Sequence, residues 1–128
     1  MLSPNWVKRT DQAWLRLEKV DLSEVTTQGV YLIWHGAYTW RDQNGRECLQ
    51  QSRWVRVGQG VICDRLQVHR SDAAILKYRA GTLYVTWASI PVAQRDGVER
   101  YLGEQLNPLV AERFPQAVPI PVRLPAAA

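Results

Sequence analysis

The chain has 128 residues, of which 46% are hydrophobic and 22% charged, and its formal net charge is +4. These values predict one globular domain with its own core and argue against a disordered or fibrous chain. No apolar run reaches the length that a bilayer requires, and the first six residues lack the features of a signal peptide, so we expect a cytoplasmic protein without a membrane partner. Two cysteines, Cys48 and Cys63, are too few for a disulfide framework.

The positive charge is concentrated in the middle of the chain. Basic and acidic residues balance within residues 1–35 and within residues 80–128, whereas residues 36–79 carry eight basic and four acidic residues. Thirteen of the sixteen basic residues are arginine, whose planar guanidinium binds phosphate through two hydrogen bonds. This distribution is compatible with nucleic-acid binding, and an ordinary basic surface explains the charge equally well.

The first half of the chain predicts a helix, a strand and a hairpin. Residues 6–20 place apolar side chains at mixed spacing after a cap at Thr10 or Asp11, which predicts a short amphipathic helix. Residues 29–35 are dense in β-branched and aromatic side chains and predict a core strand. Residues 36–52 contain the strongest turn signal, Asn44-Gly45, and predict a hairpin inserted into a smaller core.

The stretch from residue 54 to residue 69 is the part around which we expect the chain to be organised. Residues 54–57 predict a strand, Gly58-Gln59-Gly60 predicts a turn that ends it, and residues 62–69 predict a helix. Arg65 and His69 are four residues apart and therefore project from one helix face near the glycine turn. A cation and an imidazole beside exposed backbone N–H groups suit an anion such as phosphate.

The remaining segments complete an α+β arrangement. Asp72 is expected to cap a second short helix, residues 82–88 a third core strand, and residues 92–105 the longest helix, which Pro91 opens. The proline-rich residues 115–128 predict an extended segment, packed along the domain or trailing from it. This order predicts a small three-stranded core sheet, mixed or antiparallel, flanked by helices.

The order of short motifs resembles the GIY-YIG nuclease domain. The first family motif stands as Gly29-Val30-Tyr31, and the second as Arg56-Val57-Gly58 followed by Gln59. Asp64-Arg65-Leu66 and His69 match the arginine-bearing helix, and Glu99 matches the metal-binding glutamate on a later helix. The resemblance covers residues 28–114, with residues 36–52 as the insert, residues 1–27 as a lead-in and residues 115–128 as a tail.

Two positions depart from the family pattern. Arg56 stands where the second motif usually has tyrosine, and Leu109, Val110 and Ala111 follow Pro108 where the family usually has an asparagine. Asn107 precedes the proline and is at best an imperfect substitute. Both departures concern the chemistry of cleavage rather than the fold.

The resemblance implies an endonuclease that hydrolyses DNA phosphodiester bonds with one Mg²⁺ or Mn²⁺ ion. It implies that Glu99 holds the metal and that Arg65 binds a non-bridging phosphate oxygen. Tyr31 would assist or act as general base, and His69 would orient it or transfer the proton. The expected substrate-binding residues are Arg56, Gly58, Gln59 and Arg70. The expected partner is DNA, branched or damaged, and a protein partner would supply specificity.

Each candidate residue also has a structural explanation. Tyr31 suits a half-buried strand tyrosine, Glu99 an ion pair with Arg95, and His69 a packed or exposed histidine, while Arg65 suits a solvated helix position. Three functions therefore remain open at this stage: an active endonuclease, a catalytically degenerate relative that binds nucleic acid or protein, and an interaction domain that uses Trp40, Trp54 and the proline-rich tail.

Overall fold

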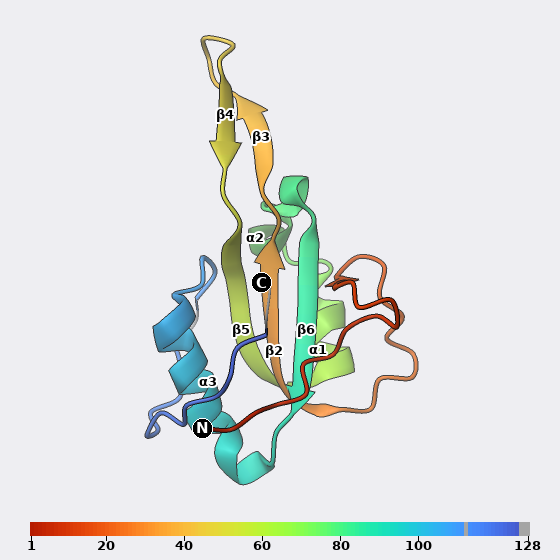
Figure 1. Cartoon of the computed structure of the whole chain (residues 1–128), viewed down its shortest axis with the longest axis vertical. Coiled ribbons are helices and arrows are strands. Elements are labelled where there is room, and N and C mark those ends of the chain that lie inside the picture. Colours follow the sequence, from red (N-terminus) through yellow and green to blue (C-terminus); the bar gives the residue numbers. More distant parts are fainter. Residues whose placement is uncertain (112, 126–128) are drawn as a thin grey trace.

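The computed structural model describes residues 1–111 and 113–125, and its main feature is a four-stranded antiparallel sheet with strand order β1-β6-β2-β5 (Figure 1). A separate two-stranded sheet, β3-β4, projects from one end. The elements are β1 (Leu15–Arg16), β2 (Gln28–His35), β3 (Tyr38–Arg41), β4 (Glu47–Gln50), β5 (Arg53–Val61), α1 (Ile62–His69), α2 (Ala73–Leu76), a 3₁₀ turn (Arg79–Gly81), β6 (Leu83–Ser89) and α3 (Val92–Leu106).

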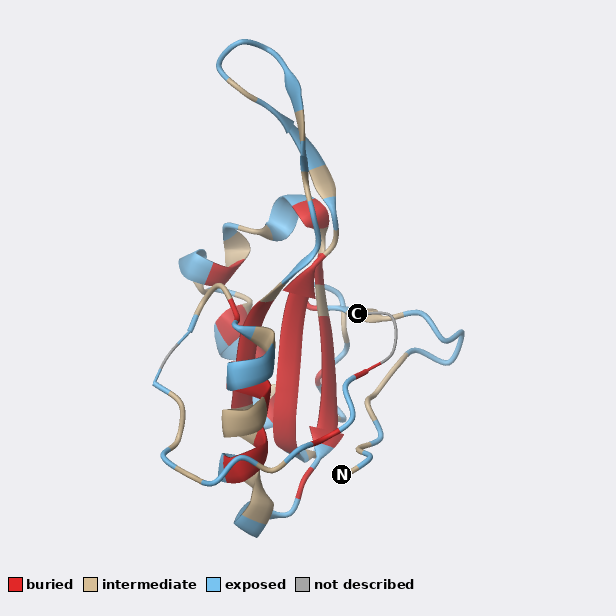
Figure 2. Ribbon diagram, turned by 60° about the vertical axis from the view of Figure 1, so that its left-hand side comes forward, coloured by how far each residue is buried: buried red, intermediate tan, exposed pale blue. Residues whose placement is uncertain are grey.

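The sheet is covered on both faces, which explains why β2 is buried along nearly all of its length. Side chains of a strand alternate between faces. Tyr31 and Ile33 accordingly pack with Leu66 of α1, whereas Val30 and Leu32 belong to a second cluster with residues of α3. Seven of the eight residues of β2 are buried, and Figure 2 shows the central strands buried and the hairpin exposed.

Several predicted elements are confirmed. The hairpin turns at Gly45, whose φ of 76° favours glycine, and the Asp42 carboxylate accepts hydrogen bonds from the backbone N–H groups of Asn44 and Arg46. The Asp72 side chain caps α2 by accepting from the Ala74 N–H. The longest helix ends at Asn107, which adopts a left-handed conformation with φ of 45°.

The predicted helix over residues 6–20 is wrong. The segment runs along the edge of β6, where the Val7 N–H donates to the Trp87 carbonyl and the Leu17 N–H donates to the Leu83 carbonyl. Asp11 accepts from the Ala13 N–H within a local turn instead of capping a helix. The unpaired edge of β6 competes for these backbone groups, and the resulting β1 makes the sheet four-stranded rather than three-stranded.

The predicted glycine turn is also wrong. Gly58-Gln59-Gly60 lies inside β5, with Gly58 opposite Tyr31 and Gly60 opposite Gly29, so the strand continues to Val61 and α1 begins at the next residue. The backbone groups that were expected to face a phosphate belong to the β2-β5 ladder. The glycines therefore serve close packing, since a β-carbon at Gly58 would clash with the Tyr31 ring.

The proline-rich tail packs along the domain as far as it is described. The Ile120 N–H donates to the Gly97 carbonyl of α3, and Val122 is buried beside Leu2, with which it forms an isolated parallel bridge. The part of the predicted tail from residue 126 onward lies outside the described residues, as does residue 112 of the predicted nuclease-like region. Among the described residues, none of the helices has the length and apolar character of a membrane span.

Candidate active site

A buried tyrosine-histidine pair joins β2 to α1. The Tyr31 hydroxyl oxygen lies 2.6 Å from Nε2 of His69, and both side chains are buried. His69 is the last residue of α1, and its Nδ1 lies 3.9 Å from a carboxylate oxygen of Asp72. This arrangement fits the structural explanation of both residues, and it also places an imidazole where it can exchange a proton with a phenol.

Gly58 makes room for the Tyr31 hydroxyl group. The two residues are opposite each other on neighbouring strands, and a β-carbon at Gly58 would lie 2.2 Å from the Tyr31 hydroxyl oxygen. Any larger residue would force the tyrosine ring to move. The glycine of the second motif and the tyrosine of the first are therefore coupled by direct contact.

Arg65 lies over Gly60 at the start of α1. A β-carbon at Gly60 would be 3.5 Å from Cγ of Arg65, and Gly60 has a φ of 130° that side chains rarely adopt. The Nε atom of Arg65 is buried and has no hydrogen-bond partner among the described residues. The guanidinium is therefore partly removed from water and still has an N–H group free to donate, which suits an anionic ligand.

Gln59 connects β5 to two carboxylates of α3. Its side-chain nitrogen donates to Glu99 Oε2 and to Asp96 Oδ1, each at 2.7 Å. Glu99 is half-buried and Asp96 is exposed. These contacts hold the Gln59 side chain between the two carboxylates. Within the described residues, Arg95 does not form the expected ion pair with Glu99; instead, its Nε donates to the Ile90 carbonyl.

The electrostatic environment of Glu99 involves both arginines of the predicted site. Burial is the largest influence and raises the pKa of the Glu99 carboxyl above its ordinary value of 4.5, as does the negative charge of Asp96. The Gln59 hydrogen bond and the charges of Arg56 and Arg65 act in the opposite direction. Arg56 itself is buried on β5, so it is placed to support an ionised Glu99 from inside the fold.

Gln59, Arg65 and Glu99 approach one another at one edge of the sheet because β5 is the outer strand. α1 follows β5 directly and packs on one face, while Gln59 pairs with Val30 and reaches toward α3 on the other. Residues from both faces can therefore approach around the same edge. Of the predicted site residues, the structure places Tyr31, Gly58 and His69 in one contact group and Gln59 and Glu99 in another, with the charges of Arg56 and Arg65 acting on Glu99.

Arg70 belongs to neither group. Its Nε donates to the Leu17 carbonyl at 2.7 Å, and its Nη2 donates to the Val20 carbonyl. The side chain therefore holds the segment after β1 against the end of α1. Conversely, sequence reasoning missed Asp96, although its position three residues before Glu99 places both carboxylates on one face of a helix.

The acidic pair fits a divalent cation that retains several other ligands. Within the described residues, no three His, Cys, Asp or Glu side chains converge as a ready-made metal cluster. Magnesium, however, is commonly bound by one or two carboxylates, with water and substrate phosphate as the remaining ligands. Asp96 and Glu99 converge on one amide nitrogen and supply such oxygen atoms, while the nearby Arg56 and Arg65 charges would weaken cation binding until an anionic substrate is present.

No family model, no curated protein and no solved structure matches this chain.

Proposed function

We propose that this chain is a metal-dependent endonuclease of the GIY-YIG type, which hydrolyses phosphodiester bonds of DNA. The observation that carries the proposal is the Tyr31–His69 hydrogen bond of 2.6 Å next to Gly58, where a β-carbon would lie 2.2 Å from the tyrosine hydroxyl oxygen. It links the first motif, the second motif and the arginine-bearing helix through direct contacts, as a shared catalytic constellation requires.

In this proposal each residue has a distinct task. Tyr31 accepts a proton from the attacking water while its own hydroxyl proton passes to Nε2 of His69, and the water oxygen forms a bond to phosphorus as the bond to the leaving oxygen breaks. Arg65 donates hydrogen bonds to a non-bridging oxygen and offsets the charge that develops there. Gln59 orients Glu99, and Arg56 favours its ionised form.

Asp96 and Glu99 would hold the divalent ion. When bound, Mg²⁺ or Mn²⁺ supplies positive charge that stabilises the leaving oxygen. The raised pKa of Glu99 is consistent with this role, because a half-buried carboxylate with an acidic neighbour is stabilised by a nearby cation.

A second candidate function is a nucleic-acid-binding domain without cleavage activity. It is favoured by the complete burial of Tyr31 and by the buried Arg56 at the position of the family's second tyrosine. A buried hydroxyl meets water only if the site opens, whereas phosphate binding by Arg65 requires no such opening. The same surface would then bind DNA without hydrolysing it.

The two functions are separated by cleavage assays on supercoiled, linear and branched DNA with Mg²⁺ or Mn²⁺. We expect Glu99→Ala and Arg65→Ala each to lower the cleavage rate about 100-fold or more. The matched controls are Glu104→Ala and Arg100→Ala, because these residues form an ion pair with each other on α3, with 2.6 Å between Arg100 Nε and Glu104 Oε1. Both controls should cleave at the normal rate.

The outcomes are distinct. Cleavage by the unaltered chain that survives Glu99→Ala would contradict the endonuclease proposal as stated. An inactive unaltered chain whose salt-sensitive DNA binding weakens in Arg65→Ala, but not in Arg100→Ala, would establish the binding function instead.

A further inference from the structure

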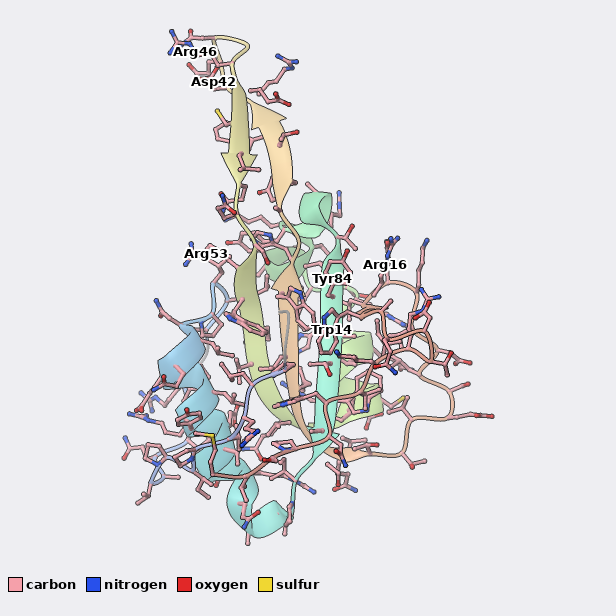
Figure 3. The ribbon with its side chains drawn as sticks, viewed as in Figure 1. Trp14, Arg16, Asp42, Arg46, Arg53 and Tyr84 are labelled. Atoms are coloured by element: carbon pink, nitrogen blue, oxygen red, sulfur yellow. The ribbon has the colours of Figure 1, made fainter. Side chains whose placement is uncertain are left out.

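A concave site lies on the sheet where the β3-β4 hairpin leaves it. This cavity has a volume of about 610 Å³, within the range of small-molecule sites. Four of its lining residues are aromatic: Trp14, Trp34, Trp54 and Tyr84. Figure 3 shows Trp14 and Tyr84 close together over β6, with Arg16 and Arg53 on either side and the hairpin above them.

The aromatic side chains form a continuous surface around buried Trp34. The ring of Trp14 lies 5.2 Å from that of Trp34 at 87°, and the ring of Trp54 lies 5.5 Å from it at 63°. Tyr84 stacks on Trp34 at 5.8 Å. Trp14, Trp54 and Tyr84 are each half-buried, so their rings are held in place by packing while part of each remains accessible. Such a surface suits a planar ring that can stack or pack edge to face.

The polar part of the cavity is positively charged. Arg9, Arg16 and Arg53 line it and are exposed, and no acidic residue is among its described lining residues. Arg9 forms an ion pair with Asp11 at 3.1 Å, whereas Arg16 and Arg53 have no ion-pair partner in the part of the chain that the structure describes. Lys8 adds a further charge 4.3 Å from the Trp14 ring centroid.

We propose that this cavity binds one unstacked nucleotide of a DNA strand, with the base against the tryptophans and the adjacent phosphates on Arg16 and Arg53. Proteins that bind single-stranded nucleic acid combine these two elements, aromatic surfaces for the bases and positive charge for the backbone. A peptide could pack on the aromatic surface, but only an acidic peptide would also neutralise the charges of Arg16 and Arg53. A nucleotide does both, because its base stacks on the aromatic rings and its phosphate binds the arginines.

The inference rests on the proposed function, because it takes DNA as the ligand. It adds a preference for DNA of a particular structure. Trp54 and Gln59 lie on the same strand, five residues apart, which corresponds to roughly 17 Å along β5. This distance spans roughly five base-pair steps of duplex DNA. A chain that holds an unstacked nucleotide here would direct cleavage to DNA with a single-stranded or branched segment a few nucleotides from the scissile phosphate.

The test is equilibrium binding of a fluorescein-labelled eight-nucleotide oligo(dT), followed by fluorescence anisotropy in EDTA so that no cleavage is involved. We expect Trp14→Leu to weaken binding roughly tenfold, because stacking on an aromatic ring is lost. Arg53→Ala should weaken it and reduce the slope of log K against log salt by about one. Trp40→Leu and Arg100→Ala are the controls, since Trp40 is exposed on the hairpin and Arg100 lies on α3, and both should bind normally.

A second measurement keeps the test independent of altered folding. Ultraviolet crosslinking of the unaltered chain to an oligonucleotide carrying 5-iododeoxyuridine should label Trp14 or Trp54, as peptide mass spectrometry would show. Normal binding by both cavity variants, or crosslinks confined to Trp40, would overturn the inference. Because no step of this test requires metal, an unaltered chain that does not cleave DNA but still binds the oligonucleotide through the cavity would separate the failure of the cleavage proposal from the failure of this one.

Discussion

The Gly58 backbone lies directly beneath the hydroxyl group of Tyr31, so close that a β-carbon would be 2.2 Å from the hydroxyl oxygen and 2.4 Å from Cζ. The contact arises because the two residues are register partners on β5 and β2. It makes the position of Tyr31 depend on the absence of a side chain on the neighbouring strand.

We therefore expect Gly58→Ala to displace the Tyr31 ring and lengthen its contact with His69. Overpacking of this kind costs about 1–3 kcal/mol of unfolding free energy, measured by urea denaturation. In a double-mutant cycle with Tyr31→Ala, the cost of Gly58→Ala should largely disappear, since the clashing atoms are gone. Additive effects of the two substitutions would contradict the proposed contact.

The raised pKa of Glu99 predicts a pH-dependent stability cost. A carboxyl whose pKa is higher in the folded than in the unfolded state binds its proton more tightly when folded, so the unfolding free energy falls as pH rises through the folded-state pKa. Glu99→Gln removes this titration. The unfolding free energy of the variant, minus that of the unaltered chain, should therefore increase as the pH rises from about 4 to about 7.

Urea denaturation at both pH values without divalent metal measures this difference directly. The exposed Glu104→Gln substitution is the control and should show no comparable gain. A variant that is less stable than the unaltered chain at neutral pH, yet equal to it in acid, would show that Glu99 stabilises the fold as an anion and would contradict the prediction.

Arg70 is expected to stabilise the fold rather than bind substrate. Removing its two hydrogen bonds to the Leu17 and Val20 carbonyls in Arg70→Ala should cost about 1.5–3 kcal/mol of unfolding free energy. Arg70→Lys should recover only part of this, because one ammonium group cannot reproduce the fork of donors. Unchanged stability, combined with a DNA-binding salt slope reduced by about one, would instead identify Arg70 as the phosphate ligand that the sequence suggested.

The projecting hairpin should be dispensable for folding of the core. β3 and β4 pair with each other in a separate sheet, and Trp40 and Leu49 are 49% and 61% exposed. Replacement of residues 39–50 by Asn-Gly should therefore change the unfolding free energy by less than about 1 kcal/mol. Tyr38 is retained because its ring lies 5.6 Å from that of His35. Loss of cooperative unfolding in the shortened chain would show that the hairpin is part of the core.

Local signals in the sequence were sufficient for several elements. Asn44-Gly45 predicts a turn through the left-handed preference of glycine, and Asp72 predicts the start of α2 through a side chain that accepts a backbone hydrogen bond. The residues of the candidate site other than Asp96 were also predictable as a set, but only through the resemblance of their motifs. None of their contacts was predictable from residue spacing alone.

The errors have one physical origin, which is competition from distant backbone groups. Residues 6–20 contain apolar side chains that would suit a helix, yet the edge of β6 offers hydrogen-bond partners and a buried position for Leu17. Gly58 and Gly60 suggest a turn, yet β2 offers a ladder in which they continue as a strand. Propensity decides local conformation only where no such partner is available.

The sequence by itself determined the α+β class, the order of most elements, the hairpin and the arginine-rich middle of the chain, because each depends on interactions within a few neighbouring residues. The tertiary structure decided the fourth strand, the assembly of Glu99 with Arg56 and Arg65 around the edge of β5, and the aromatic cavity at the opposite end of that strand. These features depend on strand register and on packing between residues far apart in the chain, which no local pattern encodes.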